Sequence, residues 1–216
     1  MRACREEGKE IPLEPLIRLL GDPDKQVIEA AIDLCGDLGE NGIMVLGSPK
    51  QRASRGNSPA EATQHLKAGL AAVASHAGAR GTTILIEPLA SKDTDVVNTL
   101  DQAVRIVEEI GNPPIQSMFD FHNTPDEREP LDTLVRRHFS RIRHVHVNEM
   151  DGRHPGTGNL DFRPVFQTLA DLRYSRWVSL EVFDTAYAAA GGKPSPEQIA
   201  RESMEYFRKL EAKLKL

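Results

Sequence analysis

Acidic and imidazole side chains recur at one point of a repeating apolar pattern. Glu87, Asp120 and Glu181 each stand at or near the end of a short apolar run, and a fourth run contains His144 and His146. With His146 taken from that pair, successive candidates are 33, 26 and 35 residues apart, close to the length of one strand plus one helix. If the runs are parallel strands, side chains at their carboxyl ends converge at one edge of the sheet.

Three carboxylates and an imidazole that meet at one point predict a metal site. Like charges a few ångströms apart would force some carboxylates to stay protonated, whereas a divalent cation favours their full ionisation. Three oxygen ligands and one nitrogen ligand favour Mn²⁺, Mg²⁺ or Co²⁺, with Zn²⁺ also compatible, and leave positions open for a chelating substrate. Each residue alone also fits a structural role, since a strand-end acid is usually solvated and a His-x-His pair is as often buried and hydrogen-bonded as metal-bound.

The elements that must position these side chains are short apolar strands alternating with helices. This order is typical of an α/β fold with a parallel sheet, and nearly continuous apolar runs indicate strands covered by helices. We expect five strands, at residues Ile43–Gly47, Thr82–Glu87, Ile115–Phe121, Ile142–Val147 and Trp177–Phe183.

The predicted helices carry recognisable start signals. Ser58-Pro59 and Ser195-Pro196 each offer an N-cap serine followed by proline at the first helical position. The periodicity predicts a third helix from about Asp95 to Ile110 and a fourth capped by Asp161. Upstream, Asp22-Pro23 is expected to open a helix that ends at about Leu38.

Composition excludes several function classes. The chain has 216 residues, 39% of them hydrophobic and 27% charged, with a net charge of -5. No run approaches the roughly 20 apolar residues of a membrane span, and the first residues lack the apolar core of a signal peptide, so we expect a cytoplasmic protein. The acidic balance and the aromatic content of 5% argue against nucleic-acid binding. A small polar molecule is the expected partner, and homo-oligomerisation stays open.

The length of one unit predicts the architecture. Residues 43–216 hold five strand–helix units of about 35 residues, and eight such units would need about 280, within the usual size of a (β/α)₈ barrel. We therefore expect one partial TIM-barrel domain over residues 1–216, with residues 1–42 as a helical remnant of preceding units. On this interpretation the barrel is truncated at its N-terminal side.

Four motifs carry a resemblance to a known family. They are ILIEPL at 84–89, FDFHN at 119–123, HVHVNEMDGRHPGTGNLDF at 144–162 and SLEVF at 179–183. Together they resemble the carboxyl half of the xylose-isomerase-like TIM-barrel superfamily, which includes ketose 3-epimerases, hydroxypyruvate isomerases and inosose dehydratases. The histidine loop that runs into PGTG is the most specific part, although this tetrapeptide alone could be a simple turn.

The resemblance implies roles for individual residues. It places the four metal ligands on Glu87, Asp120, His146 and Glu181, and it makes the two glutamates the acid–base pair on opposite faces of a sugar. A second set of residues, His122, Arg153 and Asp93, would contact substrate, but their positions depart from the family pattern. His122 follows Asp120 by two residues rather than three, and Arg153 comes one residue after Gly152, the position of the family arginine. Asp93 matches a second family acid only loosely.

The leading functional hypothesis is therefore a divalent-metal-dependent isomerase or epimerase of a sugar or related hydroxy-carbonyl compound. A proton would be removed next to a carbonyl, and the metal would stabilise the enediolate that forms. One alternative uses the same site for dehydration of a cyclic polyol or for hydrolysis. Another, from a different class, is a catalytically silent or partner-dependent barrel fragment, because five strands would leave sheet edges exposed. The substrate, its stereochemistry and the physiological metal stay open.

Overall fold

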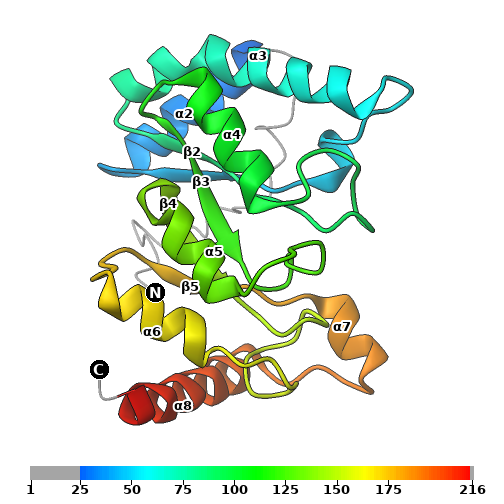
Figure 1. Cartoon of the computed structure of the whole chain (residues 1–216), viewed down its shortest axis with the longest axis vertical. Coiled ribbons are helices and arrows are strands. Elements are labelled where there is room, and N and C mark those ends of the chain that lie inside the picture. Colours follow the sequence, from blue (N-terminus) through cyan, green and yellow to red (C-terminus); the bar gives the residue numbers. More distant parts are fainter. Residues whose placement is uncertain (1–24, 215–216) are drawn as a thin grey trace.

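The structure, a computed structural model, describes residues 25–214. Five parallel strands lie in sequence order β1-β2-β3-β4-β5 and form one curved sheet, half of a barrel. The helices wrap the outside of this sheet, from α2 near one end of the molecule to α6 and α8 at the other (Figure 1). The strands are β1 (Ile43–Leu46), β2 (Thr83–Ile86), β3 (Ile115–Asp120), β4 (Ile142–Val147) and β5 (Val178–Leu180).

The helices alternate with the strands as the sequence predicts. A 3₁₀ turn at Pro49–Gln51 and another at Phe139–Arg141 complete the connections. The α-helices are α2 (Lys25–Leu38), α3 (Pro59–Ala79), α4 (Leu100–Ile110), α5 (Leu131–His138), α6 (Arg163–Asp171), α7 (Asp184–Ala189) and α8 (Pro196–Leu214). No helix within residues 25–214 is long and apolar enough to cross a membrane.

All five predicted strands are confirmed, with small differences at their ends. The last one is shorter than the apolar run, because Trp177 before it is 74% exposed and outside the ladder. Of the predicted remnant at residues 1–42, helix α2 and the turn to β1 are described, and residues 1–24 lie outside the described part of the chain.

Two helix starts differ from the predicted ones. The helix expected from Asp95 begins at Leu100, so the prediction was wrong for residues 95–99. The side chain of Asn98 donates to the carbonyls of Leu89 and Thr94, which holds this segment as a loop, and Thr99 then forms a capping box with Gln102.

The second difference concerns α6, whose N-cap residue is Phe162 rather than Asp161. The Asp161 carboxylate still accepts a hydrogen bond from the backbone N–H of Arg163, at 3.0 Å. This acid therefore satisfies one free donor of the first turn from one position further upstream.

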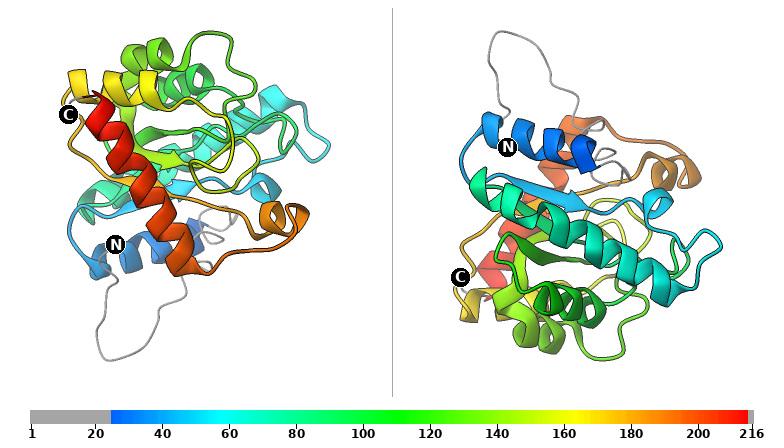
Figure 2. Two further views of the ribbon diagram at one scale, coloured as in Figure 1. Left: turned by 90° about the horizontal axis from the view of Figure 1, so that it is seen from below. Right: turned by 90° about the horizontal axis from the view of Figure 1, so that it is seen from above.

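Two apolar clusters hold the layers together. The first packs α2, α3 and part of α4 on the outer side of β1 and β2, and the second packs α4, α5, α6 and α8 on the outer side of β3 and β4. Alternate residues of β1 and β2 and of the last part of β4 enter these clusters, so the residues between them face the concave side of the sheet. A register shift near the start of β4 interrupts the alternation. Figure 2 shows this helical layer from two further directions.

Candidate metal centre

Four predicted ligands from four neighbouring strands meet at one end of the sheet. Glu87 follows β2, Asp120 ends β3, His146 lies in β4 and Glu181 follows β5. One potential ligand atom from each lies within 4.8 Å of every other. Donor atoms that share an ion at about 2.0 to 2.6 Å can be at most about 5 Å apart, so the spacing suits one divalent cation.

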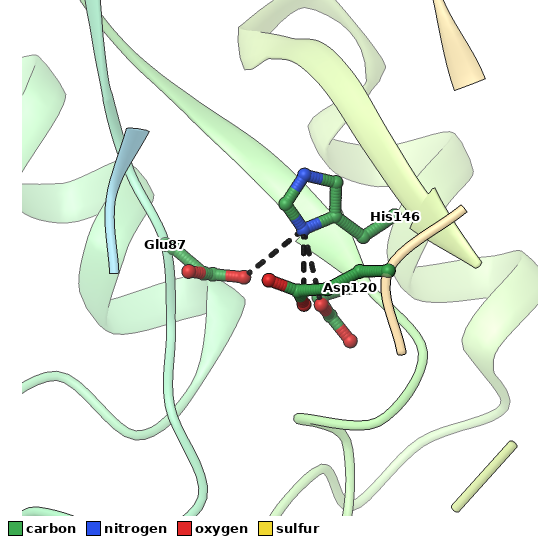
Figure 3. Close-up of side chains that lie close together, drawn as sticks. Glu87, Asp120 and His146 are labelled. Atoms are coloured by element: carbon green, nitrogen blue, oxygen red, sulfur yellow. Dashed lines mark ion pairs between the residues drawn. The ribbon is translucent and has the colours of Figure 1, made fainter. Parts of the chain in front are cut away.

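The imidazole stands at the centre of this four-residue cluster. Its Nδ1 lies 3.3 Å from Asp120 Oδ2, 3.3 Å from Glu181 Oε2 and 3.5 Å from Glu87 Oε1. Figure 3 shows the carboxylates of Glu87 and Asp120 directed at this ring nitrogen. A metal ion with open coordination positions would occupy the space that these atoms surround.

Local backbone geometry aligns the ligands. Asp120 pairs with His146 in the β3–β4 ladder, after a register irregularity between Ser117 and Phe119. The hydroxyl of Ser117 donates to the carbonyl of Ile86, which ties β3 to β2 just before Glu87. The end of each strand is thus fixed by its neighbour, and the carboxylates arrive at the same level.

Burial and charge make the cluster unusual in the absence of a cation. The side chains of Glu87 and Asp120 are 5% and 0% exposed, and Asp120 Oδ2 and His146 Nδ1 have no hydrogen-bond partner in the described part of the chain. Burial lowers the pKa of His146, but contacts with Asp120, Glu181 and Glu87 outweigh it and raise this pKa to about 12. Burial raises the pKa of Glu181, and Asp120 adds to that effect. A divalent ion among these three carboxylates and one imidazole would therefore stabilise the cluster more than their contacts with one another do.

The neighbouring His144 does not join the cluster. Its ring centroid lies 5.0 Å from that of His146, and burial followed by repulsion from His146 lowers its pKa to about 4. Of the two histidines in the His-x-His pair, the structure therefore brings one to the carboxylates and leaves the other as a neutral neighbour.

The three predicted substrate contacts lie at different distances from the cluster. The backbone N–H of His122 donates to Asp120 Oδ1, and its ring packs against Phe183 at 5.1 Å between centroids, so His122 lies beside the site. Arg153 is paired with Asp151 and donates to the carbonyl of Thr157. Asp93 is exposed in the loop after β2. The structure brings neither Arg153 nor Asp93 into the four-residue cluster.

Sequence reasoning missed several buried polar residues around the site. Asn123 donates to Glu87 Oε1 at 3.5 Å, and Asn148 accepts from the backbone N–H of His122. Glu149 is 2% exposed and accepts from the backbone of Gly156 and Leu160, which shapes the glycine-rich loop after β4. The same strand-end argument that selected the ligands would have found them, since Asn148 and Glu149 directly follow β4 and Asn123 lies three residues after the end of β3.

Gly47 is the residue of this site that lies at the end of β1. A Cβ atom at this position would stand 1.8 Å from Glu87 Oε2, so only glycine leaves room for the glutamate in its present orientation. Its backbone φ is not positive, so the requirement comes from the close approach of the carboxylate and not from backbone conformation.

Comparison with known proteins gives the same assignment of architecture. The family model described as "Xylose isomerase-like TIM barrel" matches residues 2–210. The chain is 24% identical over 165 residues to a ketose 3-epimerase of Arthrobacter globiformis, which covers 76% of this chain and 57% of that protein. It is 30% identical over 118 residues to an L-ribulose 3-epimerase of Mesorhizobium japonicum, which covers 55% of this chain and 40% of that protein.

A solved structure supports the fold. The crystal structure of D-psicose 3-epimerase in the presence of D-fructose superposes with a TM-score of 0.75 at 19% identity, over 90% of this chain and 74% of that one. At this identity the likeness establishes the fold alone. The chain spans about half the length of the two curated relatives that it matches.

Proposed function

Because the chain belongs to the xylose isomerase-like TIM-barrel family, we propose that it is a divalent-metal-dependent isomerase or epimerase of a sugar or related hydroxy-carbonyl compound. The observation that carries this proposal is the convergence of Glu87, Asp120, His146 and Glu181, whose donor atoms lie within 4.8 Å of one another. The similarity to ketose 3-epimerases supports the substrate class.

The four residues would hold Mn²⁺, Mg²⁺ or Co²⁺, with Zn²⁺ as a further candidate. The cation would supply positive charge next to the substrate carbonyl, which makes the adjacent carbon acidic enough to lose a proton. Asp120 and His146, from the two central strands of the four, would serve as ligands alone.

The two glutamates would in addition carry protons. Glu87 and Glu181 come from the first and last of the four contributing strands, so they reach the site from opposite sides. One carboxylate would take a proton from the substrate carbon and the other would return a proton to the opposite face. Return to the same carbon gives epimerisation, and return to the neighbouring carbon gives isomerisation. Burial raises the pKa of Glu181, the direction that a carboxyl group needs if it is to donate a proton as well as accept one.

The structure supports one of the three predicted substrate contacts, His122, more than the other two. His122 lies beside Asp120 and presents an imidazole at the rim of the site, so it could bind a substrate hydroxyl. Arg153, which is paired with Asp151, and Asp93, which is exposed, have no comparable support, since neither belongs to the described metal-ligand cluster.

Exchange of substrate hydrogen with deuterated solvent tests the proposal directly. The protein is incubated with Mn²⁺ in D₂O and with a panel of ketoses and hydroxy-carbonyl compounds, and deuterium incorporation is followed by NMR and mass spectrometry. We expect incorporation next to the carbonyl of at least one compound. The variant Glu181→Gln should abolish it, whereas Glu205→Gln, a change of an exposed acid on α8, should not.

Two results would contradict the proposal. If Mn²⁺ is bound and no compound in the panel exchanges hydrogen with solvent, the proposed proton transfer is contradicted. Loss of water from a cyclic polyol, seen as a mass change, would instead assign the site to dehydration.

A further inference from the structure

A second cavity lies in the helical layer, away from the metal-ligand candidates. It has a volume of about 440 Å³ and is enclosed by α2, α3, the outer face of β1 and the loop after β1. In Figures 1 and 2 these two helices run side by side over that end of the sheet. Most of its wall is apolar and includes Ile28, Leu46, Leu66, Leu70, Val73 and Ile84.

The cavity is separated from the four-residue cluster by the sheet. Leu46 and Ile84 belong to the apolar cluster beneath the helices, so they point outward from the half-barrel. Glu87 lies an odd number of residues after Ile84 and therefore faces the opposite, concave side. A ligand in this cavity would not be a substrate at the metal ligands.

The polar part of the cavity wall is positively charged. Lys25, Arg52 and Arg55 line it together with the uncharged polar residues Ser54 and Asn57, and no aspartate or glutamate does so among the described residues. A wall that combines aliphatic side chains with several cations is complementary to a molecule that has an apolar body and a negative charge.

Arg52 is the deepest of these cations. The residue is 4% exposed, and its Nη1 donates to the carbonyl of Leu46 at 3.1 Å. Its Nε and Nη2 are buried and have no hydrogen-bond partner among residues 25–214. Burial lowers its pKa to about 10, against the attraction of Glu87, so the guanidinium stays charged at neutral pH. A buried charge with unused donors is costly unless an anion completes it.

We propose that this cavity binds a small organic monoanion, with a carboxylate paired to Arg52 and an apolar body against the α2–α3 wall. The planar fork of an arginine matches the two oxygens of a carboxylate. Arg52 is the buried cation with unused donors, so one carboxylate is assigned to it, whereas Lys25 and Arg55 are exposed. The cavity shares no described residue with the four-residue cluster, but Arg52 is attracted electrostatically by Glu87, so the probes below are tested in the absence of metal and substrate.

A matched pair of probes tests the charge and the apolar body separately. Octanoate and 1-octanol share the same chain and differ in the carboxylate, and inorganic phosphate carries charge without a chain. Binding of each is measured by isothermal titration calorimetry on the full chain. We expect octanoate to bind at least tenfold more tightly than octanol, the ratio expected for a charge-assisted hydrogen bond, and phosphate to bind more weakly than octanoate.

Variants locate the site. Arg52→Met keeps the aliphatic stem and removes the charge, so octanoate affinity should fall at least tenfold, to the level of octanol. Arg55→Met, which removes a rim cation, should have a smaller effect. Because Arg52→Met could also disturb the fold, Gly69→Leu provides an independent test. Gly69 lines the cavity, and a Cβ there would have no atom of the described residues within 4 Å, so a leucine side chain should narrow the cavity and weaken octanoate binding at least tenfold.

The proposal is overturned by any of three results. Equal affinity for octanoate and octanol would show an apolar pocket without anion recognition. Unchanged octanoate affinity in a folded Gly69→Leu variant would place binding elsewhere. Tighter binding of phosphate than of octanoate would show that the cavity does not recognise an apolar body.

Discussion

Gly47 leaves the space that the Glu87 carboxylate occupies in the site. The substitution Gly47→Ala would introduce a Cβ close to the present position of Glu87 Oε2, so the carboxylate must turn away. We expect Mn²⁺ affinity to fall at least tenfold while the unfolding transition is retained, because alanine suits the backbone at this position. Calorimetric titration with Mn²⁺ measures this. Gly69→Ala, which introduces a Cβ into open space, is the matched control and should leave the affinity unchanged.

His146 makes metal affinity depend on pH. In the metal-free protein its pKa is raised to about 12 by the three carboxylates, so the imidazole is protonated at neutral pH and the contact stabilises the fold. That stabilisation is fully present below the ordinary histidine pKa of about 6.5 and is lost as the pH rises toward 12. A metal ion needs the free Nδ1 lone pair and must displace this proton.

Affinity for Mn²⁺ should therefore rise by about tenfold per pH unit between pH 6 and 8, with release of about one proton per ion. Titrations in buffers with different ionisation enthalpies measure the proton count. An affinity that is flat over this range, with no proton released, would show that His146 is not displaced by the ion.

The ligand residues illustrate what the sequence can predict. Glu87, Asp120 and Glu181 were recognisable because each follows an apolar strand at nearly the same point of a repeating unit, and parallel strands bring such points together. The choice of His146 over His144 rested on a resemblance, and the structure brings only His146 to the carboxylates. Periodicity alone could not make that choice, because both histidines point to the same side of one strand.

At the scale of elements, α4 shows why local sequence pattern misplaces a boundary. Val97 fits the apolar period of the helix that follows it, yet its φ of 62° lies outside the helical region. Val96 and Val97 resemble residues of the apolar helix face because they are buried in the first apolar cluster, but they lie in the loop before the helix. Hydrogen bonds from Asn98 to the carbonyls of Leu89 and Thr94 hold the loop. The capping box of Thr99 with Gln102 begins the helix, and the apolar period contains neither signal.

The cap of α4 gives a prediction about stability. Thr99 accepts from the backbone N–H of Gln102, and the Gln102 side chain accepts from the backbone N–H of Thr99. Replacement by alanine leaves a helix donor without its partner, so Thr99→Ala should lower the free energy of unfolding by ~1 kcal/mol. Urea denaturation measures the change. Thr99→Ser keeps the hydroxyl and should recover most of the lost stability, and equal losses in both variants would contradict the capping role.

For the molecule as a whole, the second apolar cluster joins the terminal helix to the strands that carry the site. Phe162 is fully buried and contacts Phe121 next to the β3 ligand, as well as Tyr206 and Phe207 of α8. We expect Phe162→Ala to cost ~3–5 kcal/mol, because it removes a large buried ring and leaves a cavity.

Thermal and urea unfolding of this variant, with and without Mn²⁺, measure the coupling between α8 and the site. The metal should raise the melting temperature of the wild-type protein and of Phe162→Ala alike, since the ligands remain. Trp177→Ala, a change of an aromatic residue that is 74% exposed, should leave stability nearly unchanged. A loss in Trp177→Ala as large as that in Phe162→Ala would contradict this description of the core.

Crystals of the protein grown with Mn²⁺ provide the most direct test, because the whole account rests on one ion held by four strands. Anomalous diffraction at the manganese edge locates such an ion without reference to any assumed ligand. We predict a single strong peak about 2.0 to 2.6 Å from Glu87, Asp120, His146 Nδ1 and Glu181. A structure with Mn²⁺ bound elsewhere, or with the four side chains ordered and no peak between them, would contradict the metal site and the function proposed from it.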